Sequence, residues 1–293
     1  MRAVVPTVVA VSVLAVVACN GLLGIDDRSL RPDGGLFIDR PDVVHPIDSP
    51  SAGDGTVAEA SVDAGTDAPA DASPCPSTVG PSMVLAGTVC IDKTEVTRAQ
   101  YKDFLASNPT PGGASPRCAF KTTFVPAAAW PPVGAEASLP VIHVDWCDAT
   151  AYCKWAGKRL CGARGGGPLL TSQGGSTTSQ WYYACSDDGL RSYPYGKTFD
   201  PKACNGNDHE AGAPLPAPSF ATCEGGYPGL VDMAGNVQEW FDGCDVADAA
   251  TGGNDMCLLG GGSFNLANVG CNTVFVGPRS LTYFDLGIRC CGP

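Results

Sequence analysis

The chain has 293 residues, and its 18 lysines and arginines against 30 aspartates and glutamates give a formal net charge of −12 at pH 7. Nucleic-acid-binding surfaces concentrate basic residues, so this balance argues against nucleic acid as a partner. The length suffices for one domain with a hydrophobic core.

Residues 1–18 are predicted to be a lipoprotein signal peptide. A basic Met1-Arg2 start precedes an apolar run over residues 3–18, which is shorter than the roughly 20 residues that a membrane-spanning helix needs. The run ends in Val16-Val17-Ala18-Cys19 before Asn20, which resembles a bacterial lipobox without an inner-membrane retention signal. We expect a lipid anchor on Cys19 and an exported protein on the outer membrane or cell surface. An ordinary cleaved signal peptide is the alternative.

Residues 19–74 are predicted to be a disordered tether. Residues 20–74 are rich in Asp, Pro, Ala, Gly, Ser and Thr, and their 11 acidic and 3 basic residues give a net charge of −8. Such a segment buries too little apolar surface to fold. As a flexible coil it would span on the order of 40 Å, enough to hold a domain away from a membrane. Residues 75–293 contain no second linker and are predicted to form that single domain.

The 15 cysteines are the second constraint. If Cys19 is lipidated, 14 remain, all between Cys75 and Cys291, and an even number behind an export signal predicts seven disulfides. No Cys-x-x-Cys pair is present, so zinc is the weaker interpretation. Sequence does not fix the connectivity, but close neighbours in the chain are candidate partners: Cys75/Cys90, Cys204/Cys223 and Cys244/Cys257.

The folded part begins with one predicted strand and one predicted helix. Loose alternation of apolar residues predicts a strand within residues 83–95. Thr97 is a good N-cap, and Gln100 completes a capping box for a helix that ends at Pro109.

Further along, residues 141–146 are predicted to form a second strand. A second helix is expected to begin at Asp145 or Trp146 and to stop at Gly157 in the left-handed conformation, and residues 179–185 are predicted to form a third. After residue 186 the chain is dominated by Gly, Pro and Asn. Long loops of this kind need something to hold them, such as disulfides or bound calcium.

An ordered set of motifs runs through residues 83–291. The most informative is Gly229-Leu-Val-Asp-Met-Ala-Gly-Asn-Val-Gln-Glu-Trp240, followed by Gly260-Gly-Gly-Ser-Phe264 and Leu286-Gly-Ile-Arg-Cys290. Earlier blocks include Ile91-Asp-Lys-Thr-Glu-Val-Thr-Arg-Ala-Gln-Tyr101 and Leu139-Pro-Val-Ile-His-Val-Asp-Trp146. Together they resemble the formylglycine-generating enzyme (sulfatase-modifying factor) family. The resemblance implies an α+β fold distantly similar to C-type lectins, rich in disulfides and low in regular secondary structure.

The resemblance also implies a calcium loop. By position, its ligands would be two carboxylates and two backbone carbonyls: Asp232, Glu239, Gly235 and Val237. Calcium prefers such hard oxygen ligands in a glycine-relaxed loop, and a plain turn with solvated acids is the alternative. Asn205 and Gly206 match part of a second calcium site of the family, but no convincing acidic partner follows them.

Structural cysteines carry over in part. Cys153 and Cys290 match cysteines that the family joins in a disulfide. Cys185 matches another structural cysteine, but the position of its family partner is Val276 here. Cys185 therefore needs a different partner, and Cys161 is a candidate.

The chain departs from the family at the active site. There, two cysteines five residues apart follow the Gly-Gly-Ser block and bind a copper(I) ion, which soft thiolates suit. Ser263 is kept and Cys271 takes the second cysteine position, but the first falls on Leu266. The tyrosine expected before the second cysteine is Gly270, and the tryptophan of the calcium loop is Gln238. Cys271 and Ser263 are therefore the catalytic candidates that remain.

Two interpretations of Cys271 follow. If all 14 exported cysteines pair, Cys271 is half of a disulfide, with Cys291 as a candidate partner. A free reactive thiol at Cys271 is the alternative, and it would require a second unpaired cysteine elsewhere.

We therefore expect a non-catalytic relative of the family. It would be a calcium-stabilised, disulfide-rich domain on a lipid-anchored tether, with a binding or structural role in the cell envelope and an unidentified protein or glycan partner. The alternative is a divergent copper- or oxygen-dependent oxidase that acts on a protein cysteine, as in sulfatase maturation, with Cys271 as its sole sulfur ligand. Calcium is the expected cofactor, and copper(I) is not.

Overall fold

The computed structural model describes residues 75–111, 116–245 and 253–293. The predicted signal peptide, the lipidation site at Cys19 and the tether lie outside these residues. No helix in the described ranges has the length and apolar character needed to cross a membrane.

One small sheet joins strands from near both ends of the described chain. Its strand order is β1 (Met83–Ala86), β2 (Val89–Asp92), β8 (Cys290–Cys291) and β3 (Arg159–Leu160), and its strands pair antiparallel. The single strand expected within residues 83–95 is therefore wrong, because the chain turns back in a hairpin. Ala86 pairs with Val89, and Gly87 between them has a φ of +58°, which glycine adopts readily.

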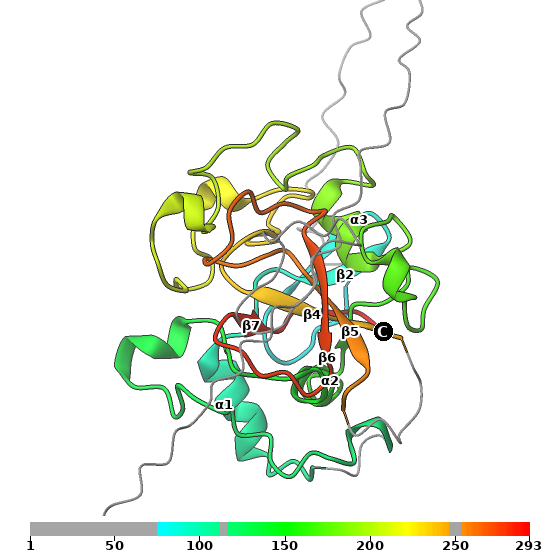
Figure 1. Ribbon diagram of the computed structural model, residues 1–293, viewed down its shortest axis with the longest axis vertical. Coiled ribbons are helices and arrows are strands. Elements are labelled where there is room, and N and C mark those ends of the chain that lie inside the picture. The colour runs from blue at the N-terminus through cyan, green and yellow to red at the C-terminus, as the bar shows by residue number, and fades with distance from the viewer. Residues whose placement is uncertain (1–74, 112–115, 246–252) are drawn as a thin grey trace, which may run out of the picture. The chain divides into compact units, whose positions relative to one another are not determined.

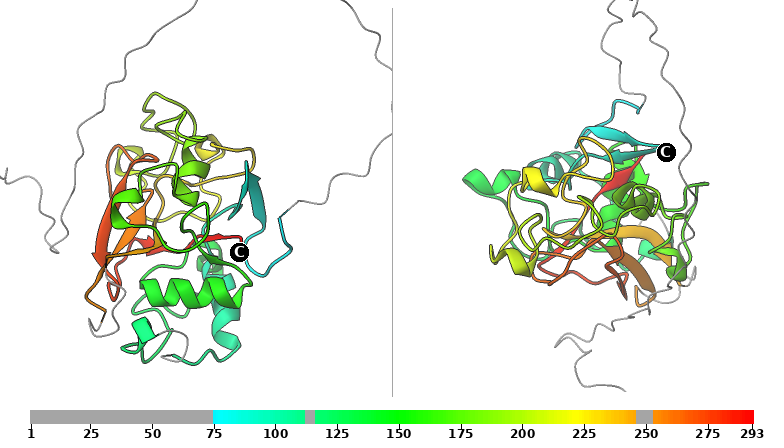
Figure 2. Two further views of the ribbon diagram at one scale, coloured as in Figure 1. Left: turned by 90° about the vertical axis from the view of Figure 1, so that its right-hand side faces the viewer. Right: turned by 90° about the horizontal axis from the view of Figure 1, so that it is seen from above.

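A second sheet forms the centre of the C-terminal half. Its order is β6 (Val274–Pro278), β5 (Met256–Gly260), β4 (Gln238–Cys244) and β7 (Leu286–Gly287), and only β4 and β7 run parallel. This sheet was not expected, since residues after 186 were predicted to be mostly loops. Both views in Figure 2 place the β1–β2 hairpin well apart from β5 and β6.

The three predicted helices are present. Helix α1 (Arg98–Ala106) begins at the Thr97–Gln100 capping box. Helix α2 (Trp146–Trp155) is capped by Asp145 and followed by Gly157 at a φ of +75°. Helix α3 (Gln180–Ser186) begins at Ser179. Short 3-10 turns occur at Pro116–Cys118, Gly134–Ser138, Thr171–Gln173, Asn207–His209 and Ala221–Cys223.

The predicted strand over 141–146 is wrong. The segment is largely buried but forms no strand, and the isolated bridge beside it joins the preceding Pro140 to Thr97. His143 has a φ of +59°, which interrupts an extended ladder.

Two apolar clusters hold these elements together. One packs Tyr101 and Phe104 of α1 against Tyr152 of α2 and Trp240 of β4, and α1 and α2 lie on the same side of the second sheet (Figure 1). The other packs Trp181 of α3 against Phe241 of β4, with ring centroids 5.2 Å apart. These clusters enclose much of the C-terminal motifs between helices and sheets.

Seven disulfides connect the described residues: Cys75–Cys90, Cys118–Cys147, Cys153–Cys290, Cys161–Cys291, Cys185–Cys271, Cys204–Cys223 and Cys244–Cys257. The three short-range candidate pairs and the Cys153–Cys290 pair are all present. Two candidate pairings, Cys161–Cys185 and Cys271–Cys291, are wrong. Cys161 bonds to Cys291 because β3 pairs with β8. Cys185 of α3 bonds to Cys271.

Candidate functional site

The two candidate catalytic residues occupy very different environments. Ser263 follows β5, is fully buried, and donates from its hydroxyl to Oδ2 of Asp285 at 2.7 Å. Cys271 is also fully buried, but its sulfur is bonded to Cys185, with Cα atoms 5.6 Å apart. The interpretation of Cys271 as half of a disulfide is confirmed. The alternative of a free reactive thiol is wrong, since a sulfur in a disulfide is neither a nucleophile nor a thiolate ligand.

The other departures from the family pattern are filled by ordinary packing. Leu266 packs partly buried beside Val269. A Cβ at Gly270 would lie 2.9 Å from the carbonyl oxygen of Ser192 and 3.0 Å from the ring of Tyr193. A tyrosine at position 270 could not be accommodated without moving Tyr193. The space around Cys271 is therefore closed by protein groups.

Gln238 belongs to a small polar cluster that sequence reasoning missed. Its Nε2 donates to Oδ2 of Asp285 at 3.1 Å, and its backbone N–H donates to the carbonyl oxygen of Asp285 at 2.8 Å. The same Oδ2 accepts from Ser263. Asp285 directly precedes the Leu286-Gly-Ile-Arg-Cys290 motif, and this position next to a motif was the only sequence signal that pointed to it.

The predicted calcium loop surrounds a buried arginine. Glu239 accepts at Oε1 from Nε of Arg289 at 2.8 Å and at Oε2 from Nε1 of Trp181 at 2.5 Å. Asp232 accepts from the backbone N–H and the hydroxyl of Ser219 at 2.7 and 2.5 Å. Arg289 also donates to the backbone carbonyls of Asp92, Val231 and Asp232. Protein donors thus already satisfy part of this ligand set.

The charge in this cluster remains unbalanced. Glu95, Asp232 and Glu239 are three buried carboxyls around the single guanidinium of Arg289. Burial raises the pKa of all three carboxyls, and the charge of Asp232 raises that of Glu95 further. Oε2 of Glu95 is buried and has no hydrogen-bond partner among the described residues. Each carboxylate oxygen also has a second lone pair, so the donor chemistry fits a hard cation such as calcium.

Asn205 and Gly206, the partial second calcium site, lie next to this loop. The backbone N–H of Asn236 donates to the carbonyl oxygen of Asn205 at 2.8 Å, and Nδ2 of Asn205 donates to Oδ1 of Asn236 at 3.0 Å. Asn205 therefore positions the predicted calcium loop. No described carboxylate forms a hydrogen bond with it, although its own Oδ1 is buried without a partner in the described part of the chain.

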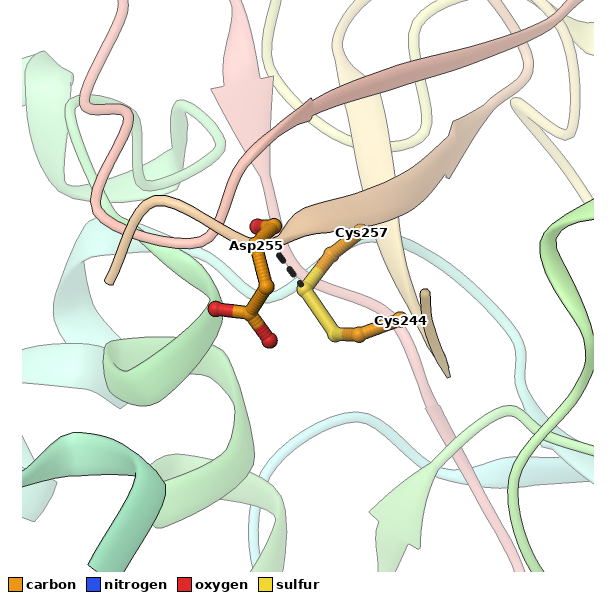
Figure 3. Close-up of side chains that lie close together, drawn as sticks. All are labelled: Cys244, Asp255 and Cys257. Carbon is orange, nitrogen blue, oxygen red and sulfur yellow. Dashed lines mark hydrogen bonds between the residues drawn. A yellow bond between two sulfur atoms is a disulfide. The ribbon is translucent and has the colours of Figure 1, made fainter. Parts of the chain in front are cut away.

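One group of potential metal ligands lies elsewhere in the described residues: Cys244, Asp255 and Cys257 (Figure 3). The two sulfurs are bonded to each other, and the carboxylate of Asp255 pairs with the buried guanidinium of Arg279. This group is therefore a structural one. Most of the segment between these two cysteines lies outside the described residues.

Two small sheets, three helices and the glycine-rich loop pinned on Arg289 define a domain of the sulfatase-modifying factor type. The chain belongs to this family: residues 81–291 match the model of the sulfatase-modifying factor enzyme 1-like domain. The predicted family and fold class are thereby confirmed.

Individual relatives include both active and inactive members by name. The chain is 35% identical over 128 residues to the mouse formylglycine-generating enzyme, covering 37% of this chain and 30% of that protein. It is 32% identical over 157 residues to the mouse inactive C-alpha-formylglycine-generating enzyme 2, covering 48% and 44%. It is 33% identical over 193 residues to the enzyme of Streptomyces coelicolor, covering 54% and 56%. The matches thus span about half or less of these relatives.

Proposed function

We propose that this protein is a non-catalytic member of the family, a pseudoenzyme that serves a binding or structural role in the cell envelope. The observation that carries the proposal is the bond between Cys271 and Cys185, together with a hydrocarbon side chain at Leu266. The family's copper(I) chemistry needs two thiolates at these positions, and this chain offers none.

Neither defect is repaired by a neighbouring group. The side chain of Leu266 packs against apolar residues and has no atom that binds a metal. Ser263, the retained active-site residue, is committed to Asp285, and Gln238 replaces the family's tryptophan with a second donor to the same carboxylate. The site has become a hydrogen-bonded part of the core. A relative named as inactive supports the idea that this family includes members without the activity.

The location of the domain is part of the proposal. Seven disulfides in the described residues are typical of an oxidising, exported environment. We propose that Cys19 carries a lipid anchor and that residues 19–74 tether the domain to an outer-membrane or cell-surface position, where it meets a protein or glycan partner. Detection of an acylated N-terminal peptide by mass spectrometry tests the anchor, and a peptide that lacks the acyl mass would contradict it.

Calcium is the proposed structural ion. Asp232 and Glu239 would hold it with carboxylate oxygens, and Gly235 and Val237 with backbone carbonyls. When bound, calcium would supply positive charge to a buried cluster in which three carboxyls face one guanidinium. The role of calcium would be to stabilise the loop that leads into β4. No chemical reaction would depend on the ion.

Alkylation of the denatured, unreduced protein tests the loss of catalysis. We expect no labelled thiol at Cys271 and a Cys185–Cys271 disulfide peptide after digestion without reduction. Titration with copper(I) under a competing chelator should show no binding to the folded protein. A thiol at Cys271 together with tight copper(I) binding would instead support the divergent oxidase that acts on a protein cysteine.

A further inference from the structure

A pocket of about 430 Å³ lies on the first sheet, away from the Ser263 cluster. It is formed by Arg159 of β3, by Arg164, Gly165 and Gly166 of the following loop, and by Gln180 at the start of α3, together with the β1–β2 turn and the residues after β8. Its volume falls within the range of about 300–1,000 Å³ that is typical of small-molecule sites. The glycine-rich loop that borders it has no part in the proposed function.

The charged side chains of the pocket wall are positive, in a chain whose net charge is negative. The formal net charge of the protein is −12, yet two arginines and no aspartate or glutamate are among the residues that line the pocket. Arg159 forms no ion pair with a carboxylate of the described residues and donates only to the carbonyls of Leu160 and Ala163, at 3.3 and 3.4 Å. Burial lowers the pKa of Arg159, and the charge of Asp242 opposes this only partly.

Arg164 is held in a position that leaves hydrogen-bond donors available. Its guanidinium carbon lies 3.8 Å from the centroid of the Tyr183 ring, and a stacked guanidinium keeps its N–H groups pointing outward in its own plane. Nη1 donates to the carbonyl of Thr177 at 3.3 Å. Its one carboxylate partner among the described residues is Asp188, at 3.5 Å. Both side chains are substantially exposed, so this ion pair is weak and exchangeable.

The remaining wall adds donors and open space. Oε1 of Gln180 accepts from the backbone N–H of Gly162 at 3.1 Å, so the hydrogen-bonding group that this side chain has left is the donor Nε2. A Cβ at Gly165 or Gly166 would have no atom within 4 Å, so the loop leaves room for a ligand. Every side chain here that bears hydrogen-bonding nitrogen is therefore a donor, which is the chemistry that oxyanions select.

We propose that this pocket binds a small organic oxyanion, whose carboxylate, sulfate or phosphate group is held by Arg159 and Arg164. The planar donor fork of arginine matches these groups in a bidentate manner. The ligand displaces the exposed carboxylate of Asp188 from Arg164 and neutralises the half-buried charge of Arg159. No residue of the lost copper site takes part, so this binding is independent of the proposed function and is tested separately.

Calorimetric titration of the full-length protein with inorganic phosphate, inorganic sulfate and succinate tests the proposal, with chloride at equal ionic strength as the reference. We expect at least one probe to bind. Arg164→Gln should weaken its affinity about tenfold, the loss expected for one charge-assisted contact. Asp188→Asn should strengthen it several-fold, because it removes the competing carboxylate.

Arg191→Gln is the matched control, because Arg191 has a similar exposure and pairs with Asp187 outside the pocket. Its affinity should equal that of the wild type. Preference for phosphate or sulfate would assign the ligand to an ester of that acid, whereas preference for succinate would assign it to a carboxylate. Binding of none of the probes beyond chloride, or equal effects of Arg164→Gln and Arg191→Gln, would overturn the proposal. All three substitutions are at accessible side chains, so folding is retained.

Discussion

Arg289 and Glu239 form an ion pair with Nε and Oε1 2.8 Å apart, and neither residue is more than 1% exposed. The contact joins the Leu286-Gly-Ile-Arg-Cys290 motif to the start of β4, where the Gly229–Trp240 motif ends, and the two residues are 50 positions apart in the chain. Arg289 also fixes three backbone carbonyls on neighbouring segments. The two motifs thus occur together because they build one buried structure.

Replacement of Arg289 should therefore strongly reduce the free energy of unfolding. Arg289→Met leaves Glu239 buried without its counter-ion, and removing one partner of a buried pair costs about 3–5 kcal/mol. Urea unfolding under non-reducing conditions measures the loss. Glu210→Gln is the control, because the Lys202–Glu210 pair is exposed, and it should leave stability unchanged. Equal stability of the two variants would show that the buried pair does not hold the motifs together.

The Cys185–Cys271 disulfide should contribute strongly to stability. It closes 86 residues of sequence separation, for which the chain-entropy model gives about 4–5 kcal/mol. Replacement of both cysteines by alanine should lower the free energy of unfolding by about that amount. The Cys244–Cys257 pair closes only 13 residues and should cost about 3 kcal/mol when replaced in the same way. An equal or larger loss of stability on replacing Cys244–Cys257 would contradict a stabilising role of the Cys185–Cys271 disulfide that grows with loop length.

Stability should fall as the pH rises through the weakly acidic range. Burial raises the pKa of Asp92 to about 6, although Lys158 and Arg289 oppose this. A carboxyl whose pKa is higher in the folded state binds its proton more tightly there. Stability is therefore lost between about pH 4 and pH 6, by up to roughly 3 kcal/mol for Asp92 alone.

The pKa values of the buried carboxyls Glu95, Asp148, Asp232 and Glu239 and of the half-buried Asp242 shift in the same direction. Urea unfolding in calcium-free buffer at pH 4.5, 5.5 and 7 measures the slope. A free energy of unfolding that rises steadily over this range would contradict the assignment of raised pKa values.

Bound calcium should offset the loss of stability that ionised buried carboxyls cause at neutral pH. At a free calcium concentration about 100-fold above Kd, one site that binds only the folded state stabilises by about 2.7 kcal/mol, which corresponds to a Tm increase of about 5–10 °C. Asp232→Asn should abolish the increase, whereas Glu210→Gln at the surface should retain it. An equal increase in the Asp232→Asn protein, or none in the wild type, would argue against calcium in this loop.

Local signals in the sequence were sufficient for the helices. Thr97 and Gln100 lie within one turn of each other, and a capping box depends on no distant contact. Short-range cysteine pairs such as Cys204–Cys223 could be predicted for the same reason. The hairpin was missed because one residue, Gly87, decides whether the chain turns back, and alternation of apolar residues continues on both sides of it.

Long-range relationships could not be derived in this way. The partner of Cys271 depends on where α3 packs against the segment after β5. The spacing of cysteines in the sequence does not predict this packing. The role of Asp285 required β7 to lie beside β4, so that one carboxylate meets both Ser263 and Gln238. The family resemblance pointed to the positions that depart from the family pattern, but only the fold shows that Tyr193 occupies the space beside Gly270.

The central claim is that the thiolate copper chemistry of the family has been lost in this chain. Incubation of the purified, copper(I)-supplied protein in air with a peptide of the sulfatase type, followed by mass spectrometry of the peptide cysteine, tests it most directly. We predict an unchanged cysteine, while the Streptomyces coelicolor enzyme serves as the positive control. Formation of formylglycine by the wild-type protein would contradict the account.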